Sequence, residues 1–275
     1  MLKIAISGAA GRMGARLIDL GNQSDHFQIV DAVDSADHPR IGEDIGPMSG
    51  IGPINVPLAA TYQNSPAAVI DFSVPAGADQ AIDYCASTKT PLVMATTGLE
   101  ESTKTKLYAA AKTIPIVFAP SMSLAVNLSM KMVEMAGKAL KDHSSGVDVE
   151  IIERHHRFKA DSPSGTALKF GEIVASVMGQ TNHQHGREGM IGQRPQNEIG
   201  YHAVRTGDKP GEHTIVFGML GETIELKVGA SNRDCYAAGA LAATSFVASQ
   251  APGMYDMYDV LGLSLIHISE PTRPY

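Results

Sequence analysis

The stretch from Glu153 to Ala167 holds the densest group of reactive side chains in the sequence. Five cationic or potentially cationic side chains fall within residues 154–159: Arg154, His155, His156, Arg157 and Lys159. Clustering such charges costs free energy unless an anion lies among them. Ser164, Gly165 and Thr166 follow Pro163 and begin a predicted helix, where backbone N–H groups and two hydroxyls suit a carboxylate or phosphate. The stretch therefore predicts a site for a small anion, with a histidine available as proton donor, and a solvated basic loop is the alternative.

A second motif lies at the end of the first predicted strand and reads Gly8-Ala9-Ala10-Gly11-Arg12-Met13-Gly14. Glycines let the backbone approach a pyrophosphate, and the following helix offers unpaired N–H groups at its N-terminus. Asp34 ends the second predicted strand, where its carboxylate can accept hydrogen bonds from ribose hydroxyls. The spacing is G-x-x-G-x-x-G rather than G-x-G-x-x-G, so a tight turn that binds nothing is the alternative. The order of these features favours a dinucleotide site: a strand, the glycines, a helix, a second strand and an acid.

The residues around this motif also bear on the choice of cofactor. An acid at Asp34 repels a 2′-phosphate, so we predict that NADH is preferred and that NADPH is used to some extent. Arg12 is the main candidate for reaching that phosphate, and Arg40 is a weaker one. Two later strand ends, at Phe72–Pro75 and at Ala95–Gly98 (with Thr96 and Thr97), are expected to border the nicotinamide half. A plain turn is the alternative for Thr-Thr-Gly.

Hydrophobic patterns predict the elements that position these motifs. Strands are expected at residues 2–7, 27–33, 67–72, 91–96 and 114–119, and helices at residues 12–20, 75–87 and 101–112. This alternation predicts a parallel sheet, with a loop over residues 35–57. After Pro120 we expect helices at residues 127–140 and 164–178, a strand at residues 147–154 and a closing helix at residues 234–249. Three further strands, at residues 199–205, 212–218 and 222–230, are expected to be antiparallel.

The predicted fold is therefore α/β, with a Rossmann-like parallel-sheet dinucleotide domain and an inserted α+β domain for substrate binding and oligomerisation. The dinucleotide domain is expected over residues 1–126 and 235–263, and the inserted domain over residues 127–234. Residues 264–275 fit neither pattern. We interpret them as a non-native tail and expect them to be disordered or to lie in a lattice contact.

Composition excludes several classes of protein. The chain has 275 residues, 44% of them hydrophobic and 19% charged, which argues against intrinsic disorder. A net charge of −7 argues against a nucleic-acid partner, and no window is apolar enough for a membrane span. The two cysteines, Cys85 and Cys235, are expected to be reduced in a cytoplasmic protein. No metal site is expected, and His183 and His185 are interpreted as surface residues.

The sequence resembles the 4-hydroxy-tetrahydrodipicolinate reductases (dihydrodipicolinate reductases) of bacterial lysine biosynthesis over residues 2–263. The resemblance rests on the glycine motif, Val-Ile-Asp-Phe-Ser at 69–73, Thr-Thr-Gly at 96–98, the His-His-Arg-Phe-Lys and Ser-Gly-Thr-Ala block, and Gly-Glu-His-Thr at 211–214. It implies hydride transfer from nicotinamide C4 to an unsaturated six-membered cyclic dicarboxylate. It also implies a homotetramer assembled through the sheet of the second domain.

The same resemblance implies roles for individual residues. His155 matches the general acid, and Lys159 matches the group that assists proton delivery and holds the substrate. The carboxylate-binding positions match His156, Ser164, Gly165 and Thr166, and Arg233 is expected to neighbour them. Two departures lie near the nicotinamide. Ala95 replaces a frequent glycine, and Ser121-Met122-Ser123 replaces a more usual Asn-Phe-Ser, which weakens the expected packing contact of Ser121 and Met122 with the ring.

Two other functions remain open at this point. One is another nicotinamide-dependent enzyme, such as an aspartate-semialdehyde or homoserine dehydrogenase. A phosphorylating semialdehyde enzyme needs a cysteine nucleophile in a cationic pocket, and neither Cys85 nor Cys235 fits that role well. The other is a non-catalytic redox sensor that binds NADH, which would not need the His/Lys/Ser-Gly-Thr cluster.

Overall fold

The computed structural model describes residues 1–264 in two compact units. The first unit comprises residues 1–124 together with the chain from Tyr236 onward, and the second comprises Ala125–Cys235. The expected non-native tail, residues 264–275, lies outside the described residues except for Ser264.

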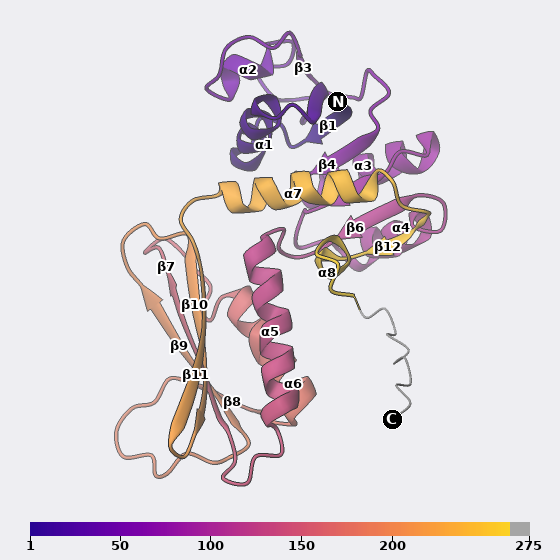
Figure 1. Cartoon of the computed structure of the whole chain (residues 1–275). Coiled ribbons are helices and arrows are strands. Elements are labelled where there is room, and N and C mark those ends of the chain that lie inside the picture. Colours follow the sequence, from indigo (N-terminus) through magenta and orange to yellow (C-terminus); the bar gives the residue numbers. More distant parts are fainter. Residues whose placement is uncertain (265–275) are drawn as a thin grey trace, which may run out of the picture. The chain divides into compact units, whose positions relative to one another are not determined.

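The first unit is built on a seven-stranded sheet in the order β12-β6-β5-β4-β1-β2-β3, in which neighbouring strands are parallel (Figure 1). The strands are β1 (Leu2–Ser7), β2 (Phe27–Val33), β3 (Leu58–Ala59), β4 (Ala68–Asp71), β5 (Leu92–Met94), β6 (Pro115–Phe118) and β12 (Gly253–Tyr255). The helices are α1 (Arg12–Gln23), α2 (Ile45–Met48), α3 (Pro75–Thr88), α4 (Glu101–Ala110) and α8 (Met257–Val260), and α7 (Asp234–Val247) enters this unit at Tyr236.

Apolar side chains on both faces of this sheet explain its parallel, doubly covered form. Along β1, Ile4 and Ile6 join a core cluster that includes residues of α1 and α7. Ala5 points the other way, into a second cluster that includes residues of α3 and α4. Because the strands are parallel, their carboxyl ends, and the motifs that follow them, lie at one edge of the sheet.

Short elements account for the differences from the expected pattern in this unit. Residues 35–57, expected to be a loop, contain α2 and a bridge between Asp44 and Pro57. The edge strands β3 and β12 were not predicted, because two or three residues carry no readable period. The predicted strands over residues 2–7 and 27–33 are confirmed by β1 and β2.

The second unit contains a five-stranded sheet in the order β11-β10-β7-β9-β8 (Figure 1). Its strands are β7 (Asp148–His155), β8 (Asn182–His185), β9 (Glu198–Arg205), β10 (Gly211–Met219) and β11 (Glu222–Ala230), and its helices are α5 (Leu124–Leu140, from Ala125 in this unit) and α6 (Gly165–Met178). Phe170 and Val174 of α6 are fully buried. A Cβ on Gly171 would come within 1.7 Å of the Tyr201 hydroxyl of β9, so α6 packs tightly on the sheet.

The expectation that β9 is antiparallel was wrong. Strand β9 runs parallel to both β7 and β8, whereas β10 is antiparallel to β7 and to β11. The reason is the connection, because α6 carries the chain from the end of β7 back to the start of β8. The four-residue strand β8 was not predicted, and His183 and His185 lie on it as exposed side chains.

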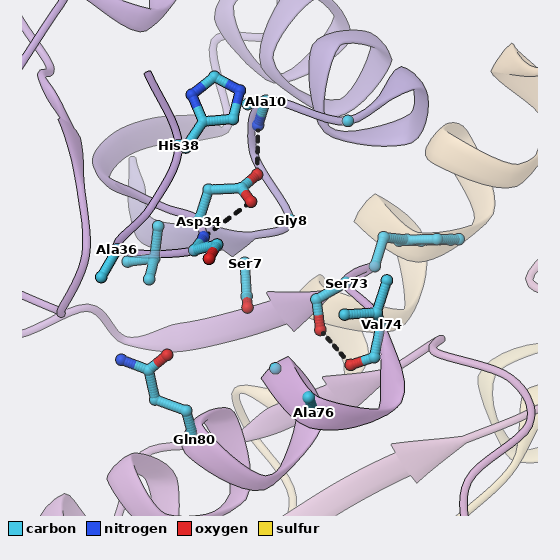
Figure 2. A pocket seen from close by; sticks show the side chains of 15 residues that line it. Ser7, Gly8, Ala10, Asp34, Ala36, His38, Ser73, Val74, Ala76 and Gln80 are labelled. Atoms are coloured by element: carbon cyan, nitrogen blue, oxygen red, sulfur yellow. Dashed lines mark hydrogen bonds between the residues drawn. The ribbon is translucent and has the colours of Figure 1, made fainter. Parts of the chain in front are cut away.

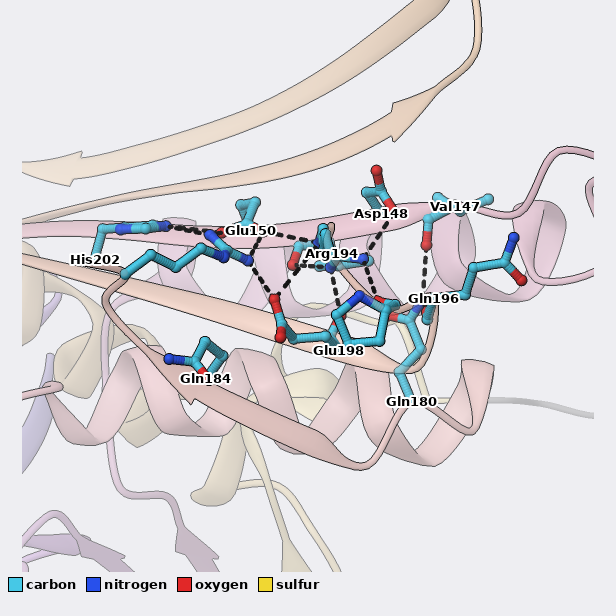
Figure 3. A network of polar contacts seen from close by, with 12 residues as sticks. Val147, Asp148, Glu150, Gln180, Gln184, Arg194, Gln196, Glu198 and His202 are labelled. Atoms are coloured by element: carbon cyan, nitrogen blue, oxygen red, sulfur yellow. Dashed lines mark hydrogen bonds and ion pairs between the residues drawn. The ribbon is translucent and has the colours of Figure 1, made fainter. Parts of the chain in front are cut away.

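The long connection from β8 to β9 is tied to the sheet by two arginines (Figure 3). Arg187 Nη2 lies 2.6 Å from Glu150 Oε1, and Arg194 Nη1 lies 2.7 Å from Asp148 Oδ1. His202 Nε2 lies 2.7 Å from Glu150 Oε2. Although partial burial opposes ionisation, these partners hold the pKa of Glu150 at about 2. Glu150 is therefore the ionised centre of a structural network on β7.

The packing of α7 generates a stability prediction. A Cβ on Gly239 would lie 1.7 Å from the Met122 carbonyl oxygen, which is backbone and has little freedom to move. We expect Gly239→Ala to lower the free energy of unfolding by about 1–3 kcal/mol, because α7 must shift in a packed core. Gly52→Ala is the matched control, since no atom lies within 4 Å of its Cβ position. Thermal denaturation of both variants checks this, and equal melting temperatures would contradict it.

Candidate functional site

The glycine motif forms a tight turn between β1 and α1. Gly8 has a φ of +74°, and a Cβ there would lie 2.5 Å from the Phe72 carbonyl oxygen. A Cβ on Gly14 would lie 2.3 Å from the Gly8 carbonyl oxygen. The backbone N–H groups of Gly8 and Ala9 both donate to the Val33 carbonyl, at 2.9 and 3.1 Å. Glycine at these positions therefore lets α1 begin directly against the ends of β1 and β4.

The N-terminus of α1 is suited to an anion. Its N-cap residue, Gly11, makes no side-chain capping bond, and the first turn contains no acidic residue. The first N–H groups of a helix have no partner within it and carry a partial positive charge. With no side chain of the cap to satisfy them, they remain available to a phosphate or carboxylate.

A cavity of about 580 Å³ lies beside this turn. Figure 2 shows Asp34 and His38 on one side of it and Ser73 and Val74 on the other. Asp34 Oδ2 accepts a hydrogen bond from the Ala10 N–H at 2.9 Å, and Oδ1 accepts one from the Ser35 N–H at 2.8 Å. Each carboxylate oxygen retains a lone pair that can accept from a hydroxyl group.

A second cavity, of about 390 Å³, shares Phe72 and Ser73 with the first. The two cavities therefore meet at the end of β4, as a ligand with two halves requires. The predicted residues that line the second cavity are Arg12, Met13, Phe72, Thr96, Thr97, Ser121 and Met122, and those that line the first are Gly8, Gly11, Asp34 and Phe72. Gly14 and Gly98 line neither one; Gly14 supports the turn, and Gly98 follows Thr97 with a φ of +71°.

Asp71, the buried last residue of β4, was not predicted from the sequence as a site residue. Its Oδ1 accepts from Ser73 Oγ at 2.7 Å, and its Oδ2 accepts from Thr96 Oγ1 at 2.5 Å. Burial raises the pKa of the Asp71 carboxyl. These bonds hold together two strand ends that line the second cavity. The available signal was an acid at the end of an otherwise apolar strand.

In the second unit, the basic stretch begins at the end of β7. His155 is the last residue of this strand and is buried, and its Nδ1 lies 2.6 Å from Glu153 Oε2. Lys159 Nζ lies 2.8 Å from Asp161 Oδ1, and Arg154 approaches Glu212 at 3.8 Å. The charges that we expected to require an external anion are thus partly balanced by acids of the chain itself. His156 Nδ1 is buried without a hydrogen-bond partner among residues 1–264.

Ser164 lies at the start of α6 and is buried. Its Oγ accepts from the Ala167 N–H at 3.2 Å and lies 3.0 Å from His213 Nε2, while its own N–H donates to Glu153 Oε1 at 3.1 Å. The hydroxyl therefore caps the start of α6 and also contacts His213. Gly165 is exposed and Thr166 half-buried at the first positions of the helix, so their backbone remains accessible.

His213 is a further residue to which the sequence analysis gave no role. It lies on β10, and burial lowers its pKa to about 4, so it is neutral at pH 7. Arg233, by contrast, is exposed between β11 and α7. Within the described part of the chain, none of the hydrogen bonds or ion pairs joins Arg233 to the basic stretch.

The described residues do not favour a cysteine nucleophile or a metal site. Cys85 is buried, and burial raises the pKa of its thiol, which makes it a poor nucleophile. No group of three or more His, Cys, Asp or Glu side chains in residues 1–264 is arranged to hold a metal ion. None of the helices described in residues 1–264 is both long and apolar enough to span a membrane.

Comparisons with known proteins agree over both units. Residues 2–122 match the family model described as dihydrodipicolinate reductase, N-terminus, and residues 125–261 match dihydrodipicolinate reductase, C-terminus. A 4-hydroxy-tetrahydrodipicolinate reductase of Rhodopirellula baltica is 55% identical, over 96% of this chain and 97% of the relative. One of Alkalilimnicola ehrlichii is 45% identical, over 95% of this chain and 99% of the relative.

Solved structures show the same fold. A dipicolinate-bound dihydrodipicolinate reductase from Paenisporosarcina sp. TG-14 superposes with a TM-score of 0.75 at 22% identity, covering 94% of this chain and 98% of that one. An amine dehydrogenase from Mycobacterium smegmatis gives a TM-score of 0.61 at 12% identity, covering 92% and 94%. The fold is thus shared with other dehydrogenases, and the sequence matches make the narrower assignment. The chain belongs to the dihydrodipicolinate reductase family.

Proposed function

We propose that this chain reduces 4-hydroxy-tetrahydrodipicolinate to tetrahydrodipicolinate with hydride from NADH or NADPH, in the diaminopimelate route of lysine biosynthesis. The observation that carries the proposal is the 55% identity, over 96% of the chain, to a relative of that name. The alternatives are less well supported. A cysteine-dependent dehydrogenase lacks a suitable thiol, and a sensor has no use for the polar groups gathered around His155.

The residues of the first unit fit a nicotinamide dinucleotide. The uncapped start of α1 suits the pyrophosphate, and the free lone pairs of Asp34 suit ribose hydroxyls. We assign the nicotinamide half to the second cavity, bordered by Thr96, Thr97 and Met122. When bound, the cofactor supplies the hydride. The protein's part is to hold and orient it, and the bonds of Asp71 to Ser73 and Thr96 stiffen that border.

The residues of the second unit supply anion binding and the proton. Loss of water from the 4-hydroxy ring leaves an unsaturated ring. One atom of this ring then accepts a hydride, and another accepts a proton. We assign proton donation to His155 and assistance by its charge to Lys159. The substrate carboxylates are assigned to His156, to Arg233 and to the backbone N–H groups of Gly165 and Thr166. Ser164 is assigned to the same carboxylate site, and its hydroxyl also caps the helix start.

The test of this activity is NADH oxidation with substrate made in place. Aspartate semialdehyde and pyruvate are combined with the preceding synthase, and the purified chain is added with NADH. We expect absorbance of NADH to fall only when both precursors and the synthase are present, because only then does the cyclic dicarboxylate form. Omission of each component is the control. No loss of absorbance in the complete mixture would reject the proposed function.

The cofactor preference is a separate proposal, resting on Asp34. Its carboxylate lines the cavity assigned to the adenosine half, where it repels a 2′-phosphate. We expect NADH to have the lower Michaelis constant and NADPH to be used as well, with Arg12 offsetting part of the repulsion. Parallel kinetics with the two cofactors at fixed substrate check this. A preference for NADPH of tenfold or more would contradict it.

We also propose a homotetramer assembled through the sheet of the second unit. Ile152 and Val204 lie on the same face of this sheet, on neighbouring strands, and are 41% and 39% exposed. Burying such residues between copies is favourable. Light scattering should give four times the mass of one chain, and a monomer at micromolar concentration would contradict the proposal. Neither Cys85 nor Cys235 forms a disulfide among residues 1–264, which supports a reducing, cytoplasmic location.

A further inference from the structure

Glu153 is a buried acid of the second unit that accepts hydrogen bonds from three residues, and the proposed reaction gives it no role. It is 1% exposed, on the same face of β7 as His155. Arg205 of β9 donates to both of its oxygens, Nη1 to Oε2 and Nη2 to Oε1, each at 2.8 Å. The Ser164 N–H and His155 Nδ1 complete the set, at 3.1 and 2.6 Å. A buried acid with these partners remains an ionised acceptor.

This arrangement determines which nitrogen of His155 carries a proton. An ionised carboxylate can only accept, so Nδ1 must be the donor in the contact with Glu153. The other nitrogen, Nε2, is then the atom that gains and loses the transferable proton. A Cβ on Gly211 would lie 2.8 Å from Nε2, so glycine at this position leaves room beside it. Glu153 thereby fixes both the orientation and the tautomer of the His155 ring.

Charged and titratable groups reach His155 from several elements. Glu153 lies on β7, Arg205 on β9, Lys159 on the following loop, and His213 on β10 with its ring centre 5.2 Å away. Burial lowers the pKa of His155, the hydrogen bond and charge of Glu153 raise it, and Lys159 and Arg205 lower it. His213 is uncharged at neutral pH. Glu153 therefore opposes the groups that disfavour the protonated ring.

We infer that Glu153 is a positioning residue, clamped by Arg205, which holds His155 with Nδ1 protonated and presents Nε2 as the proton donor. The inference rests on the proposed function, in which His155 donates this proton. In the reduction step, the nicotinamide gives a hydride to one ring atom, and Nε2 gives its proton to another. His155 is left neutral with its proton on Nδ1, Glu153 stays ionised, and solvent restores the proton on Nε2.

The first test compares pH–rate profiles of Glu153→Gln and Glu150→Gln. Activity requires protonated His155, so it falls as pH rises through the pKa of this group. Without the carboxylate charge that pKa is lower. We expect Glu153→Gln to shift the alkaline limb of kcat by about one pH unit toward lower pH and to reduce kcat about tenfold at pH 8, with NADH affinity unchanged.

Glu150→Gln is the matched control, because it removes an acid with arginine partners from the same strand. Its profile should coincide with that of the unmodified chain. An active Glu153→Gln enzyme with an unshifted profile would overturn the inference and leave Glu153 with a structural role only. A shift of equal size in Glu150→Gln would overturn it as well.

A second measurement uses the unmodified chain and does not depend on the folding of a Glu153 variant. Long-range 15N–1H spectra, with His155 assigned by comparison with His155→Gln, report the tautomer of the neutral ring. We expect the proton on Nδ1, and a neutral ring protonated on Nε2 would overturn the inference. Turnover of His155→Gln tests the proposed function separately. Near-normal turnover would remove His155 as donor, whatever its tautomer.

Discussion

A buried carboxylate must satisfy its oxygens within the protein, and this constraint organises both units. In the first unit, Asp71 draws the hydroxyls of Ser73 and Thr96 together and thereby fixes two strand ends that border a cavity. In the second, Glu153 gathers Arg205, His155 and the start of α6 around one side chain. In each unit the buried acid orders residues that we assign to the proposed site.

At the start of α1, close packing of the backbone determines the local structure. Gly8 and Gly14 in this turn have no room for a side chain, because a Cβ atom would lie 2.5 Å from the Phe72 carbonyl oxygen and 2.3 Å from the Gly8 carbonyl oxygen, respectively. The helix consequently begins at the edge of the sheet with its N–H groups uncapped. A parallel sheet brings the ends of β1, β2, β4 and β5 to this same edge. The proposed dinucleotide site thus follows from backbone geometry more than from any single side chain.

Elements with a clear hydrophobic periodicity could be predicted from the sequence. Elements that depend on contacts between residues far apart in the sequence could not. Strands β1 and β2 and the start of α1 follow directly from apolar runs and glycines, whereas β3 and β12 are too short to show a pattern. The direction of β9 depends on pairing with β7 across an intervening helix. In the site, Glu153 and Arg205 are 52 positions apart, and Ser164 and His213 are 49 apart. Local spacing carries no signal for such pairs.

Hydride transfer from the cofactor to the cyclic dicarboxylate is the central claim, and isotope transfer tests it most directly. NADH carrying deuterium at both C4 positions is supplied in ordinary water with substrate formed in place, and the product mass is measured. One deuterium should appear in each molecule of product, because the hydride moves directly from C4 to a ring atom. Product free of deuterium, or oxidation of the cofactor without reduced product, would contradict the account.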